Sequence, residues 1–154
     1  MKKKNLFLLD LDHTLIYGSY AKIETAEFLF QHNHYLKVYK RNLAEELVKR
    51  CQSKGDVIVY TTALRKYAKT ICNKLNINPI ELLSRKNCKM INGHHKKIIR
   101  KEWLDSYDRL IVIDDSPNVW LNDDKKVLFL VPMEFRGNKE DIGLQEIIDK
   151  LNKI

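Results

Sequence analysis

The sequence is poor in cysteine, proline and glycine, and it has no long apolar run. Its 154 residues include three cysteines, three prolines and five glycines. Cys51, Cys72 and Cys88 are odd in number and widely spaced, so they match no zinc-binding or thioredoxin pattern and favour a reducing, intracellular setting, nuclear or cytoplasmic. No apolar run approaches membrane-spanning length, so we expect no membrane partner. Linkers, repeats and low-complexity stretches are also lacking, and charges of both signs are spread along the whole length, which argues against a disordered chain.

The composition that remains suits a globular protein. Hydrophobic residues make up 44% and charged residues 31% of the chain, which fits one domain, residues 1–154, with a single core. The formal net charge is +8. This charge has two readings: a polyanionic partner, either a phosphorylated protein or a nucleic acid, or a background richness in lysine. It is densest between Ser84 and Trp103, where Glu102 is the one acid. We expect a monomer.

Short apolar runs alternate with segments of helical spacing. Buried parallel strands are predicted at Leu6–Asp10, Val57–Thr61, Leu110–Asp114 and Val127–Val131. Helices are predicted at residues 43–54, where Asn42 would cap the first turn, at Leu64–Leu75 and at Glu140–Leu151. Strands that alternate with helices predict an α/β fold, with a parallel sheet flanked by helices.

Two segments interrupt this alternation. Residues 26–41 alternate in polarity on either side of His32-Asn33-His34, which predicts a β-hairpin after the first strand. Residues 77–97 contain Pro79 and Gly93 and are interpreted as a short, irregular insertion over one edge of the sheet. Neither segment is long enough to form a large cap domain.

Acidic residues stand where two of the predicted strands end. Asp10 and Asp12 follow the first strand, and the pair Asp114-Asp115 ends the third. Ligands bind at the carboxyl ends of strands in such folds, and carboxylates buried there need a partner. A Mg²⁺ ion and Lys97 would relieve their repulsion and leave a slot for a phosphate group. Thr61, at the end of the second strand, would lie at the same edge. Each residue alone has an ordinary reading as a helix cap, a turn residue or a surface charge.

With these residues in this order, the sequence resembles the haloacid dehalogenase superfamily of phosphohydrolases. Asp10-Leu11-Asp12-His13-Thr14 is similar to its first motif, Thr61 to its second, Lys97 to its third and Asp114-Asp115 to its fourth. The strongest likeness is to the FCP/SCP-type, NLI-interacting-factor-like phosphatases of the RNA polymerase II C-terminal domain. Four segments carry that likeness: Leu9–Ile16, Val59–Ala68, Arg85–Cys88 and Val112–Trp120.

The sequence departs from the pattern of this family at two places. Arg41 is followed by Asn42, where the family usually has proline. The small members carry Asp-Asn where this chain has Asp114-Asp115, the form of the larger members. Specificity for the polymerase is therefore not implied.

The resemblance implies a Mg²⁺-dependent phosphatase with a haloacid dehalogenase fold and an aspartyl-phosphate intermediate. It assigns catalytic roles to Asp10, Asp12, Thr61, Lys97 and Asp114, metal binding to Asp10, Asp12 and Asp115, and substrate binding to Thr14, Thr62 and Arg85.

In this scheme Asp10 is the nucleophile, and Asp12 is the general acid and base and a metal ligand through its backbone carbonyl. Lys97 and Thr61 would steady the phosphate oxygens, and Asp114 would hold Lys97. Thr14 would fix the turn and orient Asp12.

Without a large cap, the site would admit a bulky substrate, so phosphoserine or phosphothreonine in a protein is the expected target. The alternative is a nucleic-acid-end or nucleotide phosphatase, which the positive charge also permits. A non-catalytic binding module of the same fold is the third reading, and the presence of both Asp10 and Asp12 disfavours it. Trp103 and Trp120 are expected to pack in the core rather than to stack on a base.

Overall fold

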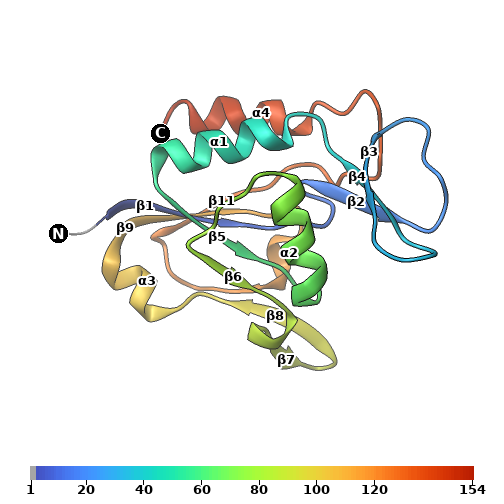
Figure 1. The fold of residues 1–154 in the computed structure, drawn as a ribbon. Helices are drawn as coiled ribbons and strands as arrows, with labels where there is room; N and C mark the ends of the chain where they lie inside the picture. Colours follow the sequence, from blue (N-terminus) through green and yellow to red (C-terminus); the bar gives the residue numbers. More distant parts are fainter. Residues whose placement is uncertain (1–2) are drawn as a thin grey trace.

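The computed structural model describes residues 3–154, and its centre is a five-stranded parallel sheet (Figure 1). The strand order is β11-β9-β1-β5-β6, and every neighbouring pair runs parallel. The strands are β1 (Lys3–Leu9), β5 (Asp56–Tyr60), β6 (Glu81–Leu83), β9 (Tyr107–Ile113) and β11 (Val127–Leu130). The four predicted strands are thus confirmed, and β6 adds an edge strand that the sequence analysis did not predict.

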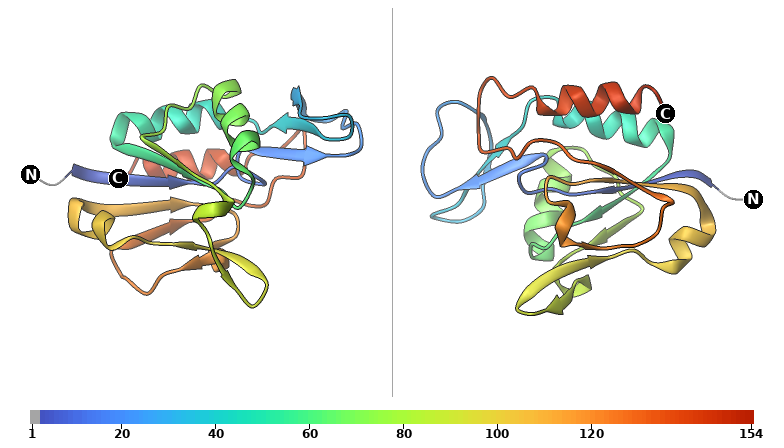
Figure 2. Two further views of the ribbon diagram at one scale, coloured as in Figure 1. Left: turned by 60° about the horizontal axis from the view of Figure 1, so that its bottom comes forward. Right: turned by 180° about the vertical axis from the view of Figure 1, so that it is seen from behind.

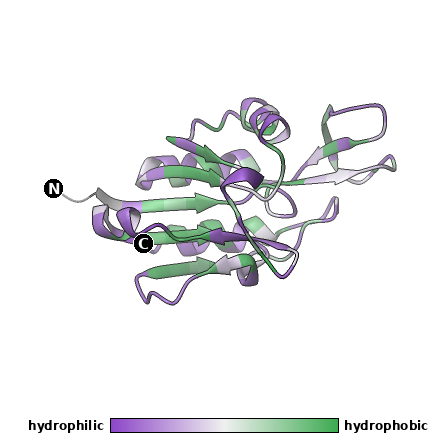
Figure 3. Cartoon of the chain, turned by 90° about the horizontal axis from the view of Figure 1, so that it is seen from below, coloured by the Kyte–Doolittle hydropathy of each residue, from purple (hydrophilic) through white to green (hydrophobic). Residues whose placement is uncertain are grey.

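Helices cover both faces of this sheet because alternate residues of each strand point to opposite sides. In β1, Phe7 and Leu9 pack in one apolar cluster, while Leu6 and Leu8 pack in another. The helices are α1 (Ala44–Lys54), α2 (Arg65–Lys74), α3 (Lys101–Ser106) and α4 (Gly143–Leu151). The first cluster contains residues of α1, α2 and α4, and the second contains Trp103 of α3 and Trp120. Figure 3 shows the strands of the sheet as the most hydrophobic part of the chain.

The predicted cap of α1 is wrong. Leu43, not Asn42, stands at the N-cap position, and its left-handed backbone (φ 68°) carries no side-chain cap. The amide of Asn42 instead donates hydrogen bonds to the carbonyls of Lys139 and Asp141. Asn42 therefore ties the start of α1 to the segment before α4, and α4 begins at Gly143, three residues later than predicted.

The predicted hairpin is present, as strands β3 (Glu27–Gln31) and β4 (Lys37–Lys40). The side chain of Asn33 accepts hydrogen bonds from the backbone of Tyr35 and Leu36, which shapes the turn. A third strand, β2 (Ile16–Ser19), pairs with β4, so the hairpin belongs to a small antiparallel sheet. Figure 2 shows this sheet projecting from the end of the central sheet.

The segment 77–97 is more regular than predicted. It contains β6, the 3₁₀ helix η1 (Arg85–Asn87), β7 (Lys89–Ile91) and β8 (His94–Ile98). Asn92 and Gly93 take positive φ angles of 50° and 79° in the turn between β7 and β8. After the 3₁₀ helix η2 (Pro117–Val119), strand β10 (Trp120–Leu121) pairs with β8 and completes a second small sheet.

Both small sheets lie beside the end of the central sheet at which the strands finish, and neither forms a large cap (Figures 1 and 2). Within residues 3–154, no helix is long and apolar enough to cross a membrane.

Candidate active site

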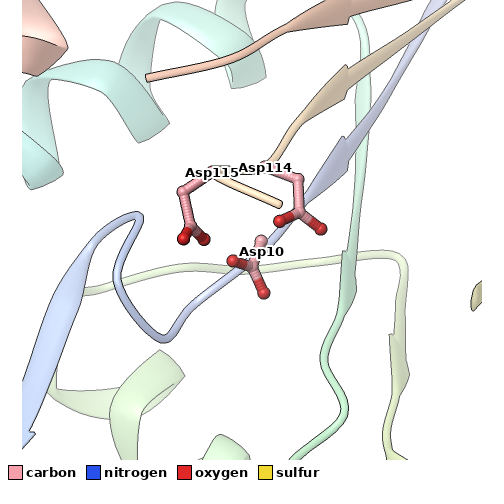
Figure 4. A group of neighbouring side chains, drawn as sticks. All are labelled: Asp10, Asp114 and Asp115. Carbon is pink, nitrogen blue, oxygen red and sulfur yellow. The ribbon is translucent and has the colours of Figure 1, made fainter. Parts of the chain in front are cut away.

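Three carboxylates converge where β1 and β9 end. Leu9 pairs with Ile113, so the next residues, Asp10 and Asp114, lie side by side, and the Asp10 amide donates to the Ile113 carbonyl. Asp115 follows directly. One carboxylate oxygen from each of the three aspartates lies within 4.8 Å of the others (Figure 4). The predicted grouping of Asp10 with Asp114 and Asp115 is therefore present.

Lys97 reaches this cluster from β8 and is almost completely buried. Its Nζ lies 3.0 Å from Oδ1 of Asp10 and 2.7 Å from Oδ2 of Asp114. Burial alone would lower the pKa of Lys97, but the negative charges of Asp10 and Asp114 outweigh that effect and raise the pKa. Lys97 is therefore a permanent cation beside the carboxylates.

Burial has the opposite effect on the aspartates. It is the main cause of the raised pKa of Asp10, and together with the charge of Asp10 it raises the pKa of Asp114 to about 6. The single charge of Lys97 balances one of three carboxylates. A second cation would stabilise the ionised form of the others.

Two further side chains fix the cluster. The hydroxyl of Thr14 donates to Oδ2 of Asp10 at 2.8 Å and accepts from the backbone amide of Asp115 at 3.1 Å. Thr14 thus holds Asp10, whereas we had expected it from the sequence to orient Asp12. The indole of Trp120 donates to Oδ2 of Asp114 at 2.8 Å. Trp120 is buried as predicted, but its bond to Asp114 was not foreseen.

Asp12 stands apart from the cluster and has its own partner. The hydroxyl of Tyr67, in α2, donates to Oδ1 of Asp12 at 3.2 Å. Burial raises the pKa of Asp12, although the hydrogen bond from Tyr67 lowers it in part. Sequence reasoning missed Tyr67. The only available signal was its place in the helix that follows Thr61.

Asp10 and Asp12 open into one small cavity of about 120 Å³. Its lining residues are Asp10, Asp12, His13, Thr62, Lys97, Asp114, Asp115, Ser116 and Val119. Such a volume suits a group the size of a phosphate rather than a whole metabolite.

Three predicted site residues do not line this cavity: Thr61, Arg85 and Thr14, the last of which contacts Asp10. The Thr61 side chain is buried, and its hydroxyl accepts a hydrogen bond from the Ala63 amide at 3.0 Å. Arg85 donates to the carbonyl of Thr62 at 2.9 Å and lines an adjoining groove of about 430 Å³, in which Thr62 also takes part.

Comparison with known proteins gives consistent matches over the whole described fold. A "Probable C-terminal domain small phosphatase" of Dictyostelium discoideum is 24% identical over 155 residues, which cover 96% of this chain and 50% of that protein. Phosphatase PSR1 of Saccharomyces cerevisiae is 25% identical over 173 residues, covering 96% of this chain and 40% of that protein. The chain thus spans about half the length, or less, of these relatives.

The fold matches a solved structure of Fcp1, an RNA polymerase II CTD phosphatase, with a TM-score of 0.61 and 17% identity, over 99% of this chain and 49% of that one. A fission yeast Fcp1 structure bound to beryllium fluoride gives a TM-score of 0.60 at 14% identity, over 99% and 50% of the two chains. These matches confirm the predicted haloacid dehalogenase fold. The family model described as "NLI interacting factor-like phosphatase" matches residues 5–154. The chain therefore belongs to the NLI interacting factor-like phosphatase family.

Proposed function

We propose that this chain hydrolyses phosphate monoesters through a phosphorylated Asp10, and that its substrates are phosphoserine or phosphothreonine residues of proteins. One observation carries the proposal: the carboxyl groups of Asp10 and Asp12 open into the same small cavity, beside the buried cation of Lys97. A nucleophile, a proton donor and a positive charge are the parts that phosphoryl transfer needs.

The carboxylate cluster fits a magnesium ion. Mg²⁺ prefers oxygen ligands and binds to proteins through one or two carboxylates. Asp10 and Asp115, together with the backbone carbonyl of Asp12, would hold it, and their uncompensated negative charge favours a divalent cation. When bound, Mg²⁺ would supply positive charge to the oxygens of the phosphate.

The reaction of the protein groups has two steps. In the first, a carboxylate oxygen of Asp10 forms a bond to phosphorus, the phosphorus–oxygen bond of the ester breaks, and Asp12 gives its proton to the leaving oxygen. In the second, the ionised Asp12 takes a proton from water and the water oxygen forms a bond to phosphorus. The bond between phosphorus and the Asp10 oxygen then breaks, which frees inorganic phosphate and restores the Asp10 carboxylate. The raised pKa of Asp12 suits this role because the carboxyl must carry a proton when the substrate arrives.

The other groups bind and orient. Lys97 offers its charge to the phosphate oxygens, and Asp114 holds Lys97 in place with the help of Trp120. Thr14 keeps Asp10 oriented through its hydroxyl. Thr62 lines the cavity, and we assign Thr61 to the phosphate oxygens and Arg85 to the part of the substrate next to the phosphate.

A protein substrate is supported by two observations. The small sheets beside the cavity leave it without a large cap, so a phosphorylated side chain on a folded or extended protein can enter. Two human relatives are named as small phosphatases of the carboxy-terminal domain of RNA polymerase II. Those relatives extend beyond the region that this chain matches.

The test is hydrolysis of a phosphoserine peptide and of para-nitrophenyl phosphate by Asp10→Asn. We expect loss of turnover with both substrates and unchanged folding. Asp105→Asn, on the exposed surface of α3, is the matched control and should keep full activity. Turnover by Asp10→Asn would remove Asp10 as the nucleophile.

A nucleic-acid-end or nucleotide phosphatase is the second candidate, and the net charge of +8 favours it. Parallel assays on phosphopeptides and on oligonucleotides with 3′- or 5′-phosphates separate the two. We expect the higher kcat/KM with the phosphopeptides.

A further inference from the structure

A groove of about 760 Å³ lies between helix α2 and the edge strand β6, outside the candidate active site. Figure 1 shows these two elements side by side. The groove is several times larger than the catalytic cavity of about 120 Å³ and lies within the size range of ligand-binding pockets. It shares none of its lining residues with that cavity. A binding role for it would therefore be separate from the chemistry.

The walls of this groove carry unbalanced positive charge. Arg65 and Lys69 line it from α2, where their spacing of four residues places them on one face of the helix, and Lys86 lines it from η1. The single acid in the lining is Glu81, whose carboxylate is 3.3 Å from Arg100 outside the groove. Within residues 3–154, neither Lys69 nor Lys86 forms an ion pair or a side-chain hydrogen bond. The ammonium groups of Lys69 and Lys86 are therefore available to pair with an anionic ligand in the groove.

Between these charges the groove combines apolar side chains with the side-chain amides of Asn73, Asn78 and Asn87. Ile80 is 59% exposed, and the lining continues through Pro79, which precedes β6, and through Leu82 and Leu83 in β6. Strand β6 pairs with β5 on one side, and on its other side Arg65 donates to the Leu82 carbonyl at 2.8 Å. No aromatic side chain lines the groove, so it lacks the stacking surface typical of sites for single-stranded nucleic acid. A mixture of apolar side chains, amides and cations fits a peptide better.

We propose that this groove binds an extended acidic segment of the protein substrate, in which apolar side chains alternate with Glu or Asp. The link to the substrate rests on the proposed function. The 3₁₀ helix η1 favours this link because it contributes to both sites. Its Arg85 lines the groove of about 430 Å³ next to the catalytic cavity, and its Lys86 lines the groove of about 760 Å³ beside β6. A polypeptide that follows η1 can thus contact both. Docking at a second place raises the effective concentration of the phosphorylated residue at Asp10.

Binding is tested first, without catalysis. The probe is a short fluorescein-labelled peptide of alternating Glu and Val, and fluorescence anisotropy reports its affinity for the full chain. The double variant Lys69→Glu/Lys86→Glu should weaken binding by about tenfold or more, because two attractive charges become repulsive. The control is Lys66→Glu, which reverses one charge on α2 at a residue outside the groove. It should bind within about twofold of the unaltered chain.

The second measurement is the KM ratio of two phosphoserine peptides, one of which carries the acidic segment. We expect a lower KM for the tailed peptide and a ratio near one in Lys69→Glu/Lys86→Glu. If the peptide does not bind, or if Lys66→Glu loses as much peptide affinity as the double variant, the proposed binding role of the groove is wrong. If the peptide does not bind but a single-stranded oligonucleotide binds tightly through Lys69 and Lys86, the groove is a nucleic-acid site and the peptide proposal is wrong. Peptide binding with equal KM values overturns the link to the substrate. Absence of phosphatase activity overturns the proposed function but leaves the binding result standing.

Discussion

Lys97 and Asp114 form a buried ion pair, with 2.7 Å between Nζ and Oδ2 and 2% of each side chain exposed. The pair joins β8, in a small sheet, to the end of β9 in the central sheet. Lys97 also lies 3.0 Å from Asp10, so one cation orders two carboxylates from neighbouring strands. The integrity of the candidate active site depends on this cation.

Replacement of Lys97 by methionine should destabilise the protein strongly. The variant keeps the length of the side chain but leaves Asp10 and Asp114 buried without their cation, and loss of one partner of a buried pair costs about 3–5 kcal/mol. The free energy of unfolding from urea titration measures the effect. Lys89→Met, at an exposed site on β7, is the control. Equal stability of the two variants would contradict the assigned role of Lys97.

The contribution of Asp114 to the stability of the metal-free protein should fall as the pH rises from about 4 to about 6. In the folded state the pKa of Asp114 is raised to about 6 from the ordinary value of 3.8, so in this window the folded protein binds more protons than the unfolded chain. A shift of about two pKa units corresponds to a change of about 3 kcal/mol in the contribution of Asp114 to the free energy of unfolding. Lys97 is protonated in both states here and adds no slope.

Urea titrations at several pH values, on the unaltered chain and on Asp114→Asn, isolate this contribution. The difference in unfolding free energy between the two proteins should change with pH over this window. Added Mg²⁺ should flatten the slope, because a cation favours the ionised carboxylates. A pH-independent difference would show that Asp114 titrates normally.

The stability of the fold should also depend on Arg41. It is fully buried, and its guanidinium donates to Asp141 at 2.6 and 2.8 Å and to the carbonyls of Thr14 and Met133. Arg41→Met should cost about 3–5 kcal/mol of stability, because Asp141 is left unpaired. Arg41→Lys should not restore it, since an ammonium cannot reproduce the bidentate contact.

The double variant Arg41→Met/Asp141→Leu is the informative comparison. It removes both charges together, so it should recover part of the loss seen in Arg41→Met. The account would be contradicted if the double variant lost more unfolding free energy than the two single variants lose together.

Tyr67 is expected to position Asp12 for proton transfer. In Tyr67→Phe the carboxyl of Asp12 loses the hydrogen bond that holds it. The kcat for a phosphoserine peptide should then fall by about tenfold, since its alkoxide needs a proton to leave. The kcat for para-nitrophenyl phosphate should change little, because nitrophenolate leaves without one. Equal losses with both substrates would indicate a merely structural role for Tyr67.

Much of the central sheet could be predicted because its strands are buried on both faces. Leu6–Leu9 and Leu110–Ile113 are continuous apolar runs that end in acids, and the parallel register then brings Asp10 beside Asp114. Strand β8 could not be found in this way. Its sequence, His94–Ile98, is polar, and it becomes a strand by pairing with β7 and β10.

The contacts that tune the site were harder to predict than its members. The bond from Tyr67 to Asp12 joins residues far apart in the sequence, and the bonds from Thr14 to Asp10 and from Trp120 to Asp114 form within irregular turns after the strands. No local periodicity encodes such contacts. The cap of α1 failed for a related reason, because the amide of Asn42 finds carbonyls almost a hundred residues away.

The most direct test of the phosphoryl-acceptor role is a crystal structure of the chain grown with Mg²⁺ and beryllofluoride, a mimic of a phosphoryl group. We predict beryllium bonded to a carboxylate oxygen of Asp10, with Mg²⁺ bound by Asp10 and Asp115. Beryllofluoride bonded to another residue, or an Asp10 carboxylate turned away from Asp115 with neither ion bound, would contradict the account.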